Sequence, residues 1–157
     1  MPVSVSHLLD AVYSSSHQDK HAAVLSAATA CEALFAEQAY SASTEARISK
    51  AIARQAVKIR DLRTRVHDGS LQVFGRSFQN DDPVGHAAIA DLWVARHAVA
   101  HGSSQQQSRH PVFADQARFA KAIGGAFAFF NWMANLTPRS WPDPMQALTT
   151  LLVRADA

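Results

Sequence analysis

Apolar residues recur every three to four positions along this sequence, which is the period of an α-helix. The two clearest stripes are Val24, Ala27, Ala28, Cys31, Leu34 and Phe35, and then Ile48, Ile52, Ile59, Leu62 and Val66. No segment shows the two-residue alternation of a half-buried strand. The pattern therefore predicts an all-α fold, an up-and-down helical bundle of four to five main helices.

The composition is that of one folded domain. The chain has 157 residues, of which 48% are hydrophobic and 18% charged, so we expect a single helical domain over residues 1–157. Cys31 is the only cysteine, which excludes an intrachain disulfide framework and a cysteine-built zinc site. The N-terminus does not resemble a signal peptide, and the most apolar stretch, residues 122–136, is shorter than a membrane span. We therefore expect a cytoplasmic protein with no membrane partner.

Start and stop signals divide the chain into helices. Ser16 and Asp19 resemble a capping box at the start of a helix that we expect to reach about Tyr40. Residues 41–44 then predict a turn and a new cap, and Gly69 predicts the end of the next helix near His67.

The second half of the chain has clearer start and stop signals for helices. Asp82 and Pro83 predict the N-cap and first residue of a helix that ends near His101, with Gly102 beyond it. After this helix we expect a polar loop over residues 103–110, a helix from Pro111 to about Leu136, and a short last helix that starts at Asp143 and Pro144.

The charge is modest overall but concentrated locally. The formal net charge is only +2, which excludes a globally basic coat for nucleic acid, yet residues 47–76 hold eight basic side chains and two acidic ones. The candidates to bind RNA phosphates on this segment are Arg47, Lys50, Arg54 and Lys58. An ordinary solvated helix face is the alternative.

The segment from Asp91 to Gly102 carries the chemistry. Arg96 and His101 are near the end of the predicted helix, and His97 is one turn before His101. An imidazole near neutral pKa can move a proton, and a guanidinium can neutralise charge that develops on a phosphoryl group. This set suits RNA cleavage without a metal, and two copies of the chain in a symmetric dimer would supply an acid and a base to one phosphate.

The motif in LWVARHAVAHG resembles the R-x4-6-H motif of HEPN domains (higher eukaryotes and prokaryotes nucleotide-binding). Arg96, His97, His101 and Gly102 match the family's positions in order, and the run AVLSAATACEALFAEQ, with Glu32, is similar to an early family helix. The resemblance implies a homodimeric endoribonuclease that uses Arg96, His97 and His101 on an RNA substrate and needs no metal or other cofactor. It further implies a role in toxin–antitoxin, phage-defence or RNA-processing systems, with an antitoxin protein as a further partner.

The family also contains non-catalytic members that only bind RNA, a nucleotide or a protein, and that is the alternative function. One subset of the family carries Tyr two residues after the motif His, where this chain has Ser103, so regulation through such a tyrosine is not expected.

Other interpretations of the same residues stay open. Arg60 and His67 also satisfy the looser motif spacing. The spacing of His97 and His101 is that of metal ligands, but no third ligand is evident, so we expect no metal site. Glu32 is a candidate to support the Arg–His pair, and Trp93 is a candidate for packing or for substrate contact.

Overall fold

The computed structural model describes residues 1–136, and every regular element in this range is a helix. Four of the helices have at least fourteen residues: α1 (Val3–Ser16), α2 (Lys20–Thr44), α7 (Pro83–His101) and α10 (Gln116–Leu136). No strand occurs in this part of the chain, so the all-α class is confirmed there. The short helix expected at Asp143 and Pro144 lies outside the described residues.

Shorter segments connect these four helices. They are α3 (Lys50–Val57), α4 (Leu62–Thr64), the π-helical segment η1 (Arg65–Gly69), α5 (Ser70–Phe74) and α6 (Phe78–Asp81), and, after α7, α8 (Ser104–Arg109) and α9 (Pro111–Ala114).

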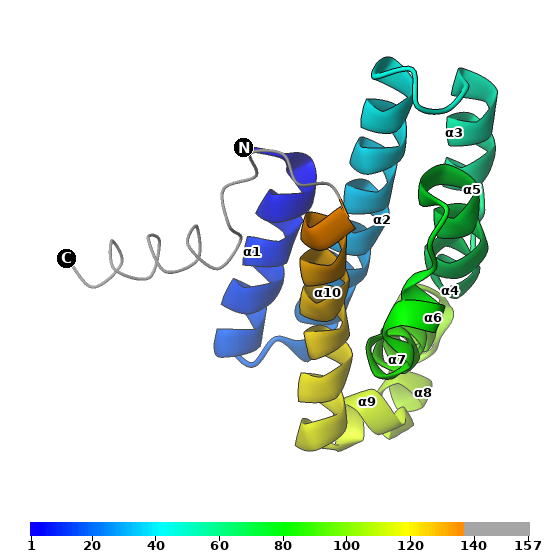
Figure 1. The fold of residues 1–157 in the computed structure, drawn as a ribbon. Helices are drawn as coiled ribbons and strands as arrows, with labels where there is room; N and C mark the ends of the chain where they lie inside the picture. The colour runs from blue at the N-terminus through cyan, green and yellow to red at the C-terminus, as the bar shows by residue number, and fades with distance from the viewer. Residues whose placement is uncertain (137–157) are drawn as a thin grey trace.

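The long helices enclose one continuous core. In Figure 1, α1 runs against the direction of α2, α10 runs in the same direction as α2, and α7 is seen nearly end-on. The core is rich in alanine and contains the fully buried rings of Phe35, Phe78 and Phe129. Alanine side chains are short, so they let helix backbones approach closely. Figure 1 also shows the short segments α3 to α6 grouped on the side of α2 away from α1.

The second helix is longer than the sequence signals predict. Its N-cap is Asp19, whose side chain accepts the Ala22 N–H, and the helix continues through Thr44. The predicted turn at residues 41–44 is therefore wrong. Ala42 is buried there, and the Thr44 hydroxyl donates to the Tyr40 carbonyl at 3.0 Å, so the polar residues are accommodated inside the helix.

The helix predicted to end near His67 is interrupted. Ser49 caps α3, which ends at Val57, and Asp61 caps a new start by accepting the N–H groups of Arg63 and Thr64. Gly69 does not end this region, because it lies inside η1 against the ring of Phe35. The helical path instead ends at Gly75, which has a φ of 69° that glycine adopts without strain.

The predicted bounds of α7 are confirmed. Asp82 caps it, Pro83 is its first residue, and it ends at His101. The expected polar loop that follows is wrong, because Ser103 and Gln106 form a reciprocal capping box that starts α8. The helix expected from Pro111 is divided at Asp115, whose carboxylate accepts the N–H groups of Ala117 and Arg118 as α10 begins.

Among residues 1–136, no helix has both the length and the apolar character needed to cross a lipid bilayer.

Candidate functional site

One side of α7 carries a row of rings. Trp93, His97 and His101 are four residues apart, so they follow one another along the same side of the helix. The Trp93 and His97 rings meet edge to face with centroids 4.8 Å apart, and the His97 and His101 centroids are 5.6 Å apart. Trp93 is buried, whereas both imidazoles are exposed, so the row leads from the core to the surface.

Arg96 lies beside this row and is held by two neighbours. Its guanidinium carbon is 4.8 Å from the centre of the Trp93 ring, a cation–π contact. One terminal nitrogen is 3.5 Å from a carboxylate oxygen of Glu32 on α2, and the two side chains are only 27% and 22% exposed. The buried Nε of Arg96 has no hydrogen-bond partner within residues 1–136.

A pocket of about 410 Å³ opens at this point. It is lined by residues from α2, from the connection before α4, from η1 and from α7: Glu32, Arg60, Asp61, Arg65, Trp93, Arg96 and His97. Three arginines, two acidic residues, one histidine and one tryptophan therefore line a single space.

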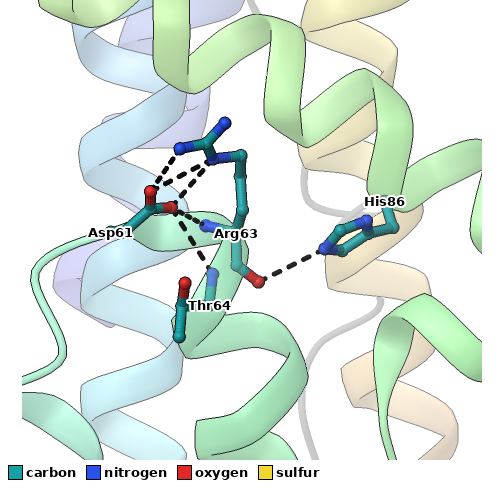
Figure 2. A network of polar contacts seen from close by, with 4 residues as sticks. All are labelled: Asp61, Arg63, Thr64 and His86. Carbon is teal, nitrogen blue, oxygen red and sulfur yellow. Dashed lines mark hydrogen bonds and ion pairs between the residues drawn. The ribbon is translucent and has the colours of Figure 1, made fainter.

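The connection between α3 and α4 is fixed by Asp61 (Figure 2). Besides capping α4, this carboxylate accepts the Arg63 Nε–H, which its two oxygens share at 3.0 and 3.1 Å, and a second hydrogen bond from Arg63 Nη2. The side-chain hydrogen bond from Arg63 lowers the pKa of Asp61. His86 on α7 then contacts the Arg63 carbonyl oxygen through its Nε2 at 3.2 Å, which ties α4 to α7.

Arg65 forms the buried wall of the pocket. The residue is 8% exposed, and its Nε donates to the Ile59 carbonyl at 2.7 Å. Burial lowers the pKa of this guanidinium, Arg96 lowers it further, and Glu32 opposes both effects. A charged group in this position is costly unless it has partners, so its surroundings favour an additional negative charge.

The ion pairs leave the pocket electropositive. Asp61 is engaged by Arg63, which does not line the pocket, and Glu32 is engaged by Arg96. Within residues 1–136, neither Arg60 nor Arg65 forms an ion pair. The arrangement can therefore bind an anion with several charge-assisted hydrogen bonds.

Two of the three predicted catalytic residues meet here. Arg96 and His97 line the pocket. His101 is exposed and does not line it, and its connection to the pocket is the ring contact with His97. Glu32, the candidate support for the pair, lies against Arg96.

The predicted RNA-binding stripe is a separate surface. Its four residues are exposed in and just before α3 or at its end, and none lines the pocket: Arg47, Lys50, Arg54 and Lys58. Arg47 is additionally paired with Glu45 at 3.1 Å. The basic segment therefore divides into these four exposed residues and a second pair, the exposed Arg60 and the buried Arg65, that lines the pocket.

Sequence reasoning did not assign Arg60, Asp61 and Arg65 to one site. The signal that could have found them is Asp61, an N-cap residue type two positions before Arg63, which marks a helix restart rather than a continuous stripe. Arg60 and His67, the alternative pair for the motif, are not both in the pocket, because only Arg60 lines it. His67 lies 2.5 Å from the Ser77 hydroxyl and 3.5 Å from Asp68.

No group of three or more His, Cys, Asp or Glu side chains among residues 1–136 is positioned to hold a metal ion. Comparisons with family models, with curated proteins and with solved structures give no match for this chain. Its site is therefore interpreted from geometry and chemistry.

Proposed function

We propose that this chain is a metal-independent endoribonuclease of the HEPN type that acts as a homodimer. The observation that carries the proposal is the position of Arg96. This guanidinium lines an electropositive pocket beside His97, and His97 is in ring contact with His101 on the exposed side of α7. Guanidinium and imidazole groups are thus adjacent, and both imidazoles are open to a substrate.

The chemistry is a transesterification within the RNA. One imidazole removes the proton of a 2′-hydroxyl, and that oxygen attacks the neighbouring phosphorus. The bond from phosphorus to the 5′-oxygen breaks, and a second imidazole protonates the leaving oxygen. The products are a 2′,3′-cyclic phosphate and a 5′-hydroxyl. Arg96 neutralises the charge on the phosphoryl oxygens during this step, and His97 orients the phosphate.

The dimer supplies the second catalytic imidazole. The outer side of α7 carries Val94, which is 45% exposed and lies one turn before the exposed His97 and two turns before the exposed His101. A second copy that packs on this side about a two-fold axis would bring the two His101 side chains together. One would act as base and the other as acid on one phosphate.

Cleavage of a fluorogenic single-stranded RNA in EDTA tests the proposal. Wild type should cleave it, and Arg96→Ala and His101→Ala should each lower the rate by at least about a hundredfold with the fold unchanged by circular dichroism. His21→Ala and Arg118→Ala are matched controls, since both residues are exposed and neither lines the pocket. Wild type without activity, or full activity in both site variants, would refute the enzyme.

A non-catalytic RNA-binding module is the second candidate. The observation that favours it is that Arg96 is already engaged by Glu32 while His101 lies outside the pocket. This module would bind RNA with an affinity that falls steeply with salt and would release it intact.

A further inference from the structure

The charges in the pocket do not balance. Arg60, Arg65 and Arg96 line it, and the carboxylate available to them is that of Glu32, because Asp61 forms its two-pronged contact with Arg63. Two guanidinium charges are therefore in excess. A phosphodiester carries one negative charge, whereas a terminal phosphate monoester carries close to two at neutral pH, so the monoester is the better electrostatic match.

Two of the three cationic groups, those of Arg65 and Arg96, are held in place before a ligand arrives. Arg65 is fixed by its hydrogen bond to the Ile59 carbonyl, and Arg96 is fixed by Glu32 and by the Trp93 ring. Arg60 precedes the capping residue Asp61, so the start of α4 sets its backbone position, while its side chain is exposed. The two preorganised guanidiniums lose less conformational entropy on binding than mobile surface lysines would.

The indole of the pocket is not a stacking platform for a base. Trp93, its indole, is 6% exposed and is covered on one face by the Arg96 guanidinium, so it offers a nucleobase little open ring to stack on. The other ring of the lining is the exposed imidazole of His97. The volume of about 410 Å³ is within the range of small-ligand sites and accommodates a phosphate with its attached sugar.

We infer that Arg60, Arg65 and Arg96 form a subsite for a terminal phosphate monoester of a nucleotide or an RNA chain. The inference rests on the proposed function, because it places a phosphorylated chain end beside the phosphate that is cleaved. Recognition is independent of base identity, and Arg60 is a binding residue that the cleavage chemistry itself does not need.

Binding of an uncleavable probe tests the inference apart from catalysis. The probes are 2′-O-methyl hexanucleotides that carry a fluorophore at one end and either a phosphate or a hydroxyl at the other, measured by fluorescence anisotropy. For wild type, a phosphate at the free 5′ or 3′ end should tighten binding about tenfold. Arg60→Gln should abolish this difference, and Arg118→Gln, an exposed arginine outside the pocket, should retain it.

Competition separates the two sources of the phosphate. AMP and an unlabelled phosphorylated oligonucleotide each compete with the phosphorylated probe. If the two compete equally well, the ligand is a free nucleotide. If AMP competes far more weakly, the ligand is the end of an RNA chain. Adenosine should not compete in either case.

The inference is overturned if neither terminal phosphate changes affinity, or if Arg60→Gln keeps the full preference. Cleavage without any phosphate preference would leave the ribonuclease standing and remove the subsite. Phosphate-dependent binding without cleavage of an unmodified RNA would support the subsite and refute the ribonuclease.

Discussion

At the scale of single residues, Glu32 sets how much positive charge the pocket offers. It is 3.5 Å from Arg96 and also interacts electrostatically with the buried Arg65. A carboxylate in this position keeps Arg96 in place between ligands, and it repels an incoming phosphate. In the proposed function, Glu32 therefore improves the order of the site and weakens its affinity for an anionic ligand.

We predict that Glu32→Gln tightens binding of an uncleavable oligonucleotide by a few-fold, because the substitution removes one negative charge from the pocket wall while it preserves the shape of the side chain. Anisotropy titrations at several salt concentrations measure this effect. Asp115→Asn, an exposed carboxylate at the start of α10, is the control and should change affinity little. Weaker binding by the Glu32 variant would show that holding Arg96 matters more than charge.

The contribution of Asp61 to the stability of the fold depends on pH. The folded-state pKa of Asp61 is lowered by the hydrogen bond from Arg63, so its contribution to stability is present above the ordinary carboxyl value of about 4 and is lost as the pH falls through the folded-state value. We predict that Asp61→Ala lowers the free energy of unfolding by about 1 kcal/mol at pH 7, mainly through loss of the cap.

Urea denaturation at pH 7 and below pH 4 measures this. The gap between wild type and the Asp61 variant should shrink in acid, and Asp10→Ala, a carboxylate on α1 with 67% exposure, should show no comparable loss. A gap that is constant with pH would mean that ionisation of Asp61 does not contribute.

The local part of the site could be predicted from the sequence and the rest could not. Arg96, His97 and His101 share one helix, and Asp82 and Pro83 define its start, so their spacing alone relates them. Arg60 and Arg65 line the pocket because the helical path is interrupted between Val57 and Leu62. That break depends on which of several polar residues becomes the cap, and tertiary packing decides this choice.

At the scale of elements, the contact between α7 and α10 decides where the site side of α7 points. Gly125 makes this contact: a Cβ there would lie 2.8 Å from both the Ala88 Cβ and the Ile89 backbone nitrogen. Neither neighbour is the end of a flexible side chain, so the two helices would have to separate. Gly124, the preceding residue, has open space around it.

This pair of glycines gives a matched test. We predict that Gly125→Ala lowers the free energy of unfolding by about 1–3 kcal/mol through overpacking. Gly124→Ala should instead raise it by about 0.5–1 kcal/mol, since alanine favours a helix interior. Chemical denaturation of the two variants measures both changes, and equal effects would mean that α7 and α10 are not in close contact at Gly125.

Element boundaries show the same limit of sequence reasoning. The periodic apolar stripe identified α2, but its end at Thr44 was missed because Ser41 and Ser43 are typical of turns. The continuous stripe from Ile48 to Val66 suggested one helix, whereas two caps and a π-helical segment divide that region. Apolar spacing indicates which residues are buried. It does not show where one helix ends and the next begins when both continue the same apolar stripe.

At the scale of the whole molecule, the proposed enzyme needs a second copy on the outer side of α7. We predict that Val94→Glu converts the dimer to a monomer and lowers RNA cleavage at least about tenfold, because a charge would be buried at the axis. Val94 is 45% exposed in the single chain, so the variant should keep the helical circular dichroism spectrum of the wild type.

Light scattering gives the mass in solution, and Val3→Glu is the matched control, since Val3 is 60% exposed on α1. A wild-type protein that is monomeric while it cleaves RNA would place both imidazoles in one copy, with His97 taking the second role.

Mass spectrometry of the RNA products tests the central claim most directly. A single-stranded RNA incubated with the protein in EDTA should yield fragments with a 2′,3′-cyclic phosphate and a 5′-hydroxyl, and a 2′-O-methyl group at a cleaved position should block cleavage there. Fragments with a 3′-hydroxyl and a 5′-phosphate, or an RNA recovered intact, would contradict a guanidinium–imidazole ribonuclease at Arg96, His97 and His101.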